Sequence, residues 1–209
     1  EDKDFFGVYA ATDAIPYMRL EVYYMGLFDD FTVQEMVGNS AVDRAISNRL
    51  HTIGARLEAL FFESFRIEGE AVFQLGKRTD PNAPTKELDH FATAYFFEMS
   101  YQIPVPTYPT IGAFFTTASG DANPNDGKSV DFQPLFPTEH GFLGAMDMLT
   151  WSNIMDIGGT LSLTPPAGFS IVVDFHYFML AQKHGRLFGL ANGSTAGTDV
   201  GRNVGMEID

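Results

Sequence analysis

The side chains best suited to chemistry in this sequence are arginines and carboxylates at alternate positions. Arg56 and Glu58 show this spacing, as do Glu68 and Glu70. Every second residue of a β-strand points to the same side, so this spacing gathers charge on one face. A guanidinium pairs with a carboxylate through two parallel hydrogen bonds, so the face could contact an acidic ligand. The alternative is that its own charges pair across strands and hold the sheet together.

The candidates for this charged face come from several alternating segments. We single out the three arginines as the best candidates for contact with an acidic ligand. The full set is Arg19, Glu21, Arg56, Glu58, Arg66, Glu68, Glu70, Glu98, Asp174 and His176.

Enzyme chemistry finds little support, and we predict that the protein is not an enzyme. The sequence contains no G-x-S-x-G, H-E-x-x-H, P-loop or G-x-G-x-x-G motif. Glu68 and Glu70 invite comparison with the carboxylate pair of a glycosidase. Any alternating strand produces this spacing, so the pair by itself does not indicate a catalytic site.

Composition narrows the classes of partner. The 209 residues carry a formal net charge of -14, which argues against binding to nucleic acid. The absence of cysteine excludes disulfides and Cys-ligated zinc. Asp121, Asp126 and Asp131 offer oxygen ligands for calcium, but the loop lacks D-x-D-x-D-G spacing. His140 and Asp147 are too few for a metal site, so we predict no metal and no cofactor.

The segments that must position the charged face are strands with alternating polarity. In 53–61, Ile53, Ala55 and Leu57 oppose Arg56 and Glu58, and a turn near Glu63-Ser64 leads into a matching strand over 65–75. One apolar face and one charged face result. Eight strands and the start of a ninth are predicted, over residues 5–12, 17–27, 53–61, 65–75, 90–102, 111–119, 159–164, 169–182 and 204–209.

The intervening segments are predicted to be loops. Residues 29–48 suggest a long loop with a short helix over 33–36, and 79–87 and 120–129 are rich in turn residues. Residues 131–156 depart from period two, and 141–156 could be helical in part. Residues 189–202 form a further loop rich in glycine, serine and threonine.

The predicted fold class is all-β: an antiparallel transmembrane β-barrel. Several predicted strands exceed the usual globular length of about 5 to 6 residues, and short turns alternate with long loops, as in an outer-membrane barrel. No apolar run approaches the roughly 20 residues that a spanning helix needs. A soluble β-sandwich that acts as a binding module is the alternative fold.

One segment resembles the signature of the alginate-export family of outer-membrane barrels. The form of that motif is F-x-P-L-F-P-T-x-H-x-x-L-G-x-M-D, followed by N-x-x-D, and residues 132–156 match it. The matching residues are Phe132, Pro134, Leu135, Phe136, Pro137, Thr138, His140, Leu143, Gly144, Met146, Asp147, Asn153 and Asp156.

The resemblance implies a monomeric, porin-like channel of about eighteen strands in the outer membrane of a Gram-negative-type bacterium. Residues 1–209 would then form one β-barrel domain that is incomplete at one or both ends. The charged face would line the pore, with arginines that attract a polyuronate. Acidic residues outnumber basic ones on that face, which leaves room for a different solute.

Two functions follow from these observations. The first is a channel for passive passage of an alginate-like polysaccharide or small polar solutes, with outer-membrane lipid around it. The second is a structural or anchoring barrel within a larger assembly.

Overall fold

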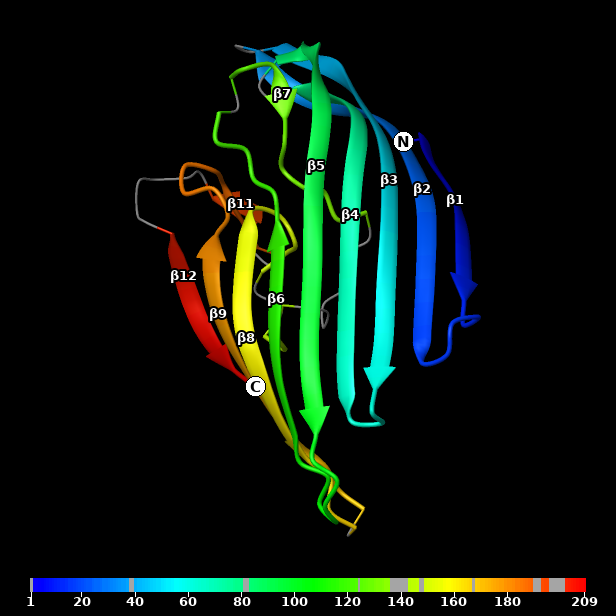
Figure 1. Ribbon diagram of the computed structural model, residues 1–209. Coiled ribbons are helices and arrows are strands. Elements are labelled where there is room, and N and C mark those ends of the chain that lie inside the picture. The colour runs from blue at the N-terminus through cyan, green and yellow to red at the C-terminus, as the bar shows by residue number, and fades with distance from the viewer. Residues whose placement is uncertain are drawn as a thin grey trace.

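The computed structural model describes residues 2–37, 40–80, 83–123, 125–135, 143–146, 149–166, 168–189, 193–195 and 202–209. Over these residues the regular structure is β-strand (Figure 1). The strands are β1 (Asp2–Thr12), β2 (Met18–Val37), β3 (Ser40–Phe61), β4 (Phe65–Asp80), β5 (Ala83–Gln102), β6 (Thr110–Ala118), β7 (Lys128–Ser129), β8 (Ile154–Leu163), β9 (Ile171–Leu180), β10 (Leu187–Gly189), β11 (Gly193–Thr195) and β12 (Asn203–Ile208). Among the described residues, no helix is long and apolar enough to cross a membrane.

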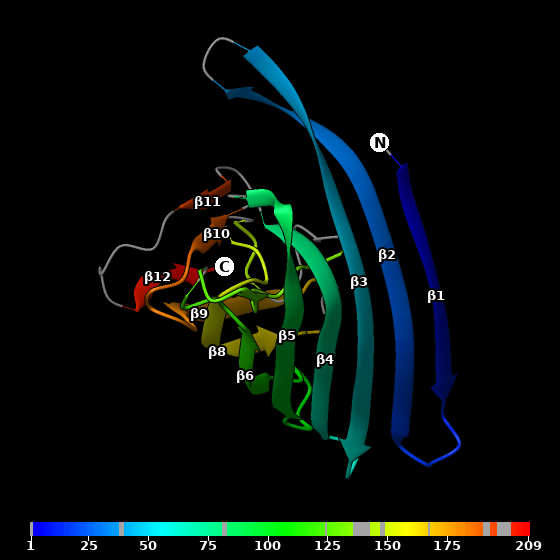
Figure 2. The same cartoon turned by 90° about the horizontal axis from the view of Figure 1, so that it is seen from above.

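Nine strands form one antiparallel path in the order β1-β2-β3-β4-β5-β6-β8-β9-β12. The short strand β7 pairs in parallel with β5, and β10 pairs with β11 in a separate hairpin. The sheet bends from β5 through β6, β8 and β9 to β12 (Figure 2). The prediction of an antiparallel all-β fold of the barrel type is confirmed, and the nine predicted segments correspond to the nine strands of this path.

The turn between β3 and β4 shows how local sequence sets the hairpins. Phe62 and Glu63 both have positive φ angles, of 51° and 60°. Two successive positive φ angles are typical of a type I′ turn, whose twist matches that of the flanking strands. The predicted turn near Glu63-Ser64 is therefore confirmed.

One face of the sheet is an apolar belt that is open to the surroundings. Ile53 is opposite Phe73, and Gly69 is opposite Phe97, so apolar side chains continue from strand to strand. Their exposed fractions are high for large apolar residues, for example 48% for Ile53 and 40% for Phe97. The exposed apolar residues of this face include Leu20, Val22, Ile53, Phe73, Leu75, Phe91, Tyr95, Phe97, Met99, Ile111, Ile157, Leu161, Val173, Phe175, Met206 and Ile208.

The belt ends in aromatic residues and then in charges. Phe6 packs against Phe28 with 5.5 Å between ring centroids. The Tyr24 hydroxyl and His51 Nδ1 share a hydrogen bond of 2.7 Å. Past this group, Lys77 lies 3.7 Å from Asp89. An apolar band flanked by aromatic residues is the outer surface that a barrel presents to lipid.

The opposite, concave face carries the small core. Val72, Ala94 and Ile154 of the sheet are buried there together with Phe132 of the connection between β6 and β8. Trp151 packs edge-on against Phe132 at 5.5 Å. Described residues of the connection between β6 and β8, Phe132 and Trp151 among them, therefore pack on the concave face.

Two loop predictions are corrected. Residues 29–48 are not a loop with a helix, because β2 and β3 stay paired from Asp29–Asn48 to Val37–Ser40. Residues 79–87 also lie largely in strands, since Thr79 pairs with Glu87. The apolar alternation fades here, but backbone hydrogen bonds need no apolar side chains, so the ladder continues.

The partly helical prediction over 141–156 is also wrong where it can be compared. Residues 143–146 form a turn, 149–153 are irregular, and β8 begins at Ile154. In the predicted loop 189–202, the described residues Gly193–Thr195 form the short strand β11.

Candidate functional site

Strand register brings the predicted charged residues to the concave face. Glu21 is opposite Arg56, and Arg56 is opposite Glu70. In the next row, Glu58 is opposite Glu68, which is opposite Glu98. Paired residues of antiparallel strands point to the same side, so these side chains share one surface.

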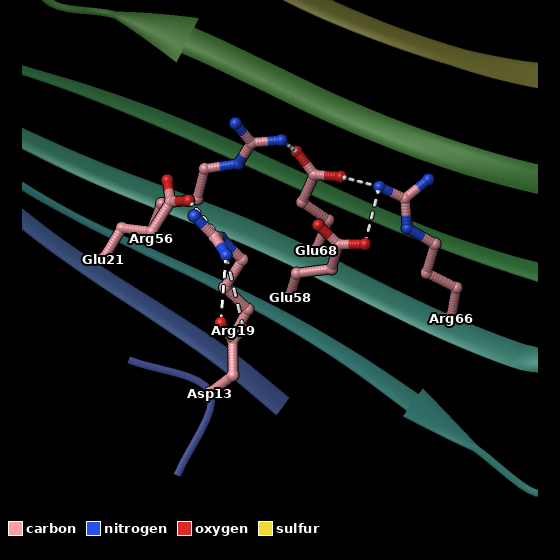
Figure 3. A network of polar contacts seen from close by, with 7 residues as sticks. All are labelled: Asp13, Arg19, Glu21, Arg56, Glu58, Arg66 and Glu68. Carbon is pink, nitrogen blue, oxygen red and sulfur yellow. Dashed lines mark hydrogen bonds and ion pairs between the residues drawn. The ribbon is translucent and has the colours of Figure 1, made fainter. Parts of the chain in front are cut away.

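Glu68 is the centre of an ion-pair network on this surface (Figure 3). Its Oε1 accepts a hydrogen bond from Arg56 Nη2 at 2.5 Å, and its Oε2 accepts one from Arg66 Nη2 at 2.7 Å. Arg66 also lies 3.2 Å from Glu58 Oε1. The Glu68 side chain is only 7% exposed, so two guanidiniums balance one nearly buried carboxylate.

Arg19 forms a second, more open branch of charges. Its Nε donates to Glu21 Oε1 at 2.6 Å, and its Nη1 lies 3.1 Å from Asp13 Oδ2. Figure 3 shows Asp13 and Glu21 approaching the Arg19 guanidinium. Each of the three arginines singled out from the sequence thus has a carboxylate partner within the same wall.

Tyr23 ties together three strands beside this network. Its hydroxyl donates to Glu70 Oε1 at 2.5 Å, across the intervening strand β3. The ring passes over Gly54, where an added Cβ would lie 2.1 Å from Tyr23 Cζ. Glycine at this position therefore leaves the space that lets Tyr23 reach β4.

A second cluster lies on the concave face between β5 and β12. Glu98, Asp174, His176 and Asp209 line a cavity of about 500 Å³ together with Phe114. His176 Nδ1 is 2.6 Å from Asp156 Oδ2, and His176 Nε2 is 3.7 Å from Asp209 Oδ2. Glu98, Asp174 and His176 were candidates from the sequence.

Glu207 and Asp209 were not identified from the sequence, although they alternate with Met206 and Ile208. Their carboxylates bind residues 145 and 146 of the β6–β8 connection beside the cavity. Glu207 Oε1 accepts a hydrogen bond from the Met146 backbone N–H at 2.7 Å, and Asp209 Oδ2 accepts one from Ala145 at 3.0 Å. The alternation of polar and apolar residues in β12 could have identified them, but six residues are too short a stretch to establish a period of two.

Gly144 allows this close approach. Its φ is +85°, a conformation that favours glycine, and an added Cβ would lie 2.7 Å from Glu207 Oε2. Any larger residue would push the segment away from β12.

Asn153 of the family-like motif joins two connections. It is fully buried, with a φ of 48°. Its Nδ2 donates to the carbonyl oxygens of Gln182 and Arg186 at 3.1 and 2.7 Å, and its Oδ1 accepts from Gln182 N–H at 2.8 Å. The amide thus fastens the end of the β6–β8 connection to the residues that follow β9.

The other motif residues have mainly packing contacts or cannot be compared. Phe132 is buried against Trp151, Asp156 binds His176, and Gly144 contacts Glu207. Pro134 and Leu135 are half-buried. Phe136, Pro137, Thr138, His140 and Asp147 lie outside the described residues.

Polar side chains of the wall also anchor the start of the β6–β8 connection. Gln74 Nε2 donates to the Gln133 carbonyl oxygen at 2.6 Å, and Gln74 Oε1 accepts from Gln133 N–H at 2.9 Å. Asp131 Oδ1 accepts from Asp121 N–H at 2.6 Å, while burial raises the pKa of the Asp131 carboxyl above its ordinary value. The connection is therefore bonded to the sheet as well as packed on it.

A metal centre finds no support in the part of the chain that the structure describes. There, no group of three or more histidine or carboxylate side chains gathers closely enough to hold an ion. Asp121, Asp126 and Asp131, considered as calcium ligands, do not form such a group. His140 and Asp147 lie outside the described residues.

A family model described as alginate export matches residues 1–209. No curated protein shows a significant match to this sequence.

Proposed function

The chain belongs to the alginate export family, and on this premise we propose that it forms an outer-membrane channel for passive passage of a polysaccharide or small polar solutes. The observation that carries the proposal is the division of the sheet into two faces. The outer face is an apolar belt, with Phe97 and Phe175 about two-fifths exposed. The concave face gathers the ion-paired charges around Glu68.

This division suits a barrel wall in a bilayer. Strands that alternate apolar and polar residues place one set against lipid and the other against a water-filled interior. In the proposal, the residues of the concave face line the path of the solute. They are Arg19, Glu21, Arg56, Glu58, Arg66, Glu68, Glu70, Glu98, Asp174 and His176. We further propose that residues 1–209 belong to one barrel domain and that the protein functions as a monomer in the outer membrane of a Gram-negative-type bacterium.

One observation favours a second candidate, a barrel with a structural or anchoring role. The β6–β8 connection packs on the concave face, with Phe132 buried and residues 145 and 146 bonded to β12. A connection that occupies the interior narrows any path through it. A closed barrel in a larger assembly would need no open path.

Ionic current through the full-length protein in a planar bilayer distinguishes the candidates. We expect open-channel current, measured with and without added polyuronate. Block by micromolar polyuronate would identify a polyuronate path, and current without block would identify a channel for small polar solutes. Absence of current from protein that is correctly folded, as judged by heat-modifiable gel migration, would refute the channel and favour the structural barrel.

A further inference from the structure

We propose that three cations on the outer face of the wall, Arg49, Lys77 and Lys128, bind the phosphate groups of a lipid in the surrounding outer leaflet. The inference rests on the proposed barrel in the outer membrane and assigns it a lipid partner with a phosphorylated headgroup. We call these three residues the cation row. The row lies at the end of the apolar belt, on the face of the wall away from the proposed solute path.

Strand register places the three cations side by side. Arg49 of β3 is opposite Lys77 of β4, and Lys77 is opposite Asp89 of β5. Lys128 of β7 is paired with the same Asp89, and β7 lies beside β5 (Figure 1). Arg49 is four residues from Ile53 of the belt, so the row shares the outer face. Three strand spacings give the row a span of about 15 Å.

The pairing of Arg49 with Lys77 leaves two positive charges opposite each other. Like charges in directly opposite positions destabilise a sheet. On the concave face, by contrast, Arg56 is opposite Glu70 and bound to Glu68. An anion between Arg49 and Lys77 would remove the repulsion, and phosphate oxygens accept the paired hydrogen bonds of a guanidinium.

Lys77 has carboxylate partners, but they bind it loosely. Its Nζ is 3.6 Å from Glu87 Oε2 and 3.7 Å from Asp89 Oδ1, and all three side chains are more than half exposed. Exposed ion pairs of this kind contribute little to stability. A phosphate group, with more charge and more acceptor oxygens than a carboxylate, can therefore compete for the ammonium group.

The other two cations lack such partners. In the part of the chain that the structure describes, neither Arg49 nor Lys128 has a carboxylate within ion-pair distance. Asp4 is in the same row as Arg49 but two strands away, and Asp30 lies one row further from the belt. The positive charge of Arg49 and Lys128 is therefore available to an anion from outside the chain.

The belt beside the row favours a lipid over a dissolved anion. Leu75 and Phe91 are opposite each other one row nearer the belt than Lys77, and they are 41% and 52% exposed. His51 of the aromatic edge is opposite Leu75. Acyl chains against these side chains would bring their headgroup to the level of the cations. A dissolved anion would instead approach a chain with a net charge of -14.

The position of the row along the strands indicates the leaflet. Arg49 lies near the end of β3 that is opposite the short β3–β4 turn, and Lys128 belongs to the long β6–β8 connection. Outer-membrane barrels have short turns on the periplasmic side and longer connections outside. The row therefore belongs to the level of the outer-leaflet headgroups.

The test is binding of diphosphoryl lipid A to the full-length protein in detergent micelles, measured by native mass spectrometry. The reference ligand is monophosphoryl lipid A with the same acyl chains, and we expect the natural protein to bind it less tightly. The double variant Arg49→Gln with Lys77→Gln should weaken binding of diphosphoryl lipid A by about fivefold for each cation removed. It should also reduce the difference between the two lipids. If the double variant does not fold, each single variant should still show its own part of the loss.

The matched control is Lys3→Gln, which removes a lysine from the opposite, concave face, where Lys3 lies 3.3 Å from Asp29. Its affinity for both lipids should equal that of the natural protein. Equal binding of the two lipids by the natural protein, or a double variant that binds like it, would overturn the lipid site. A loss in Lys3→Gln as large as that of one row variant would do the same, because the effect would then be one of total charge.

Ionic current in a phosphatidylcholine bilayer, which contains no lipid A, tests the channel separately. Current without phosphate-dependent lipid binding would overturn the lipid site and leave the channel. Phosphate-dependent binding without current would support the lipid site and overturn the channel.

Discussion

At the scale of single residues, Glu68 and Glu58 show how the position of a carboxylate in the wall determines how much its ion pairs contribute to stability. Both carboxylates lie in the same cross-strand row, yet their surroundings differ. Glu68 is nearly buried and receives two short charge-assisted hydrogen bonds, from Arg56 and Arg66. Glu58 is 40% exposed and meets Arg66 at 3.2 Å. Buried charges stabilise only when they are paired, and exposed pairs contribute little.

Glu68→Gln should therefore destabilise the barrel more than Glu58→Gln. The first variant leaves two guanidiniums without their shared carboxylate, and we expect a loss of about 1–3 kcal/mol in the free energy of unfolding. The second removes one partly exposed contact and should cost about 0.5 kcal/mol. Urea titration of the full-length protein in liposomes, followed by heat-modifiable gel migration, measures both. Equal losses would contradict the central place of Glu68.

At the scale of elements, the connections and the wall are held together by a few polar side chains. Gln74 bonds the start of the β6–β8 connection, Glu207 holds residue 146, and Asn153 joins the end of the connection to residues 182–186. All three lie at positions where the backbone would otherwise leave donors or acceptors unsatisfied. The connection behaves as part of the wall because these bonds are distributed along it.

Asn153→Ala should loosen both connections at once. The variant removes three hydrogen bonds to backbone groups and leaves the Gln182 N–H and the Arg186 carbonyl oxygen without the partner that Asn153 gives them, so we expect a local loss of about 1–3 kcal/mol. Limited proteolysis should then cut faster within residues 119–153 and 181–186, while cleavage of the strands stays unchanged.

The control for this experiment is Asn123→Ala in the same connection. The Asn123 side chain is exposed and accepts one hydrogen bond, from Asn125 N–H at 3.3 Å. Its proteolysis pattern should match that of the natural sequence. If Asn153→Ala also matched it, Asn153 would not join the two connections.

At the scale of the whole molecule, the apolar belt determines which solvent the outer face requires. A contiguous surface of exposed large apolar side chains runs from β2 to β12, including Ile53, Phe97 and Phe175. A protein surrounded by water rarely exposes so extended an apolar surface. The belt, its aromatic edge at Phe6 and Phe28, and the charges at Lys77 beyond it agree with one placement in a bilayer.

A charge in the belt should be costly in proportion to its depth. Phe97→Arg places a guanidinium on the outer face of β5 within the belt, and we expect a cost of about 2–4 kcal/mol for folding into liposomes, as for the bilayer midplane. Phe62→Arg changes a residue of the β3–β4 turn that is 94% exposed and should fold normally. Equal folding of the two variants would argue that the belt does not face lipid.

The sequence by itself determined the local features of this protein. Alternation along 53–61 and 65–75 predicted two-faced strands, because the direction of a side chain in a strand depends only on its position along the chain. The same local rule places Arg56 with Glu58 on one face of the first strand and Glu68 with Glu70 on one face of the second. The all-β fold and the family could therefore be predicted before any contact was known.

Only the tertiary structure decided which charges meet and where the strands end. Arg56 and Arg66 share Glu68 because register places two strands side by side, and spacing along one strand carries no register. Residues 29–48 continue as strands because neighbouring backbones bond to each other, a gain that apolar periodicity does not record. Gln74 and Glu207 bind the β6–β8 connection across 59 and 61 positions of the chain. Such contacts arise only when the sheet bends and brings distant segments onto one face.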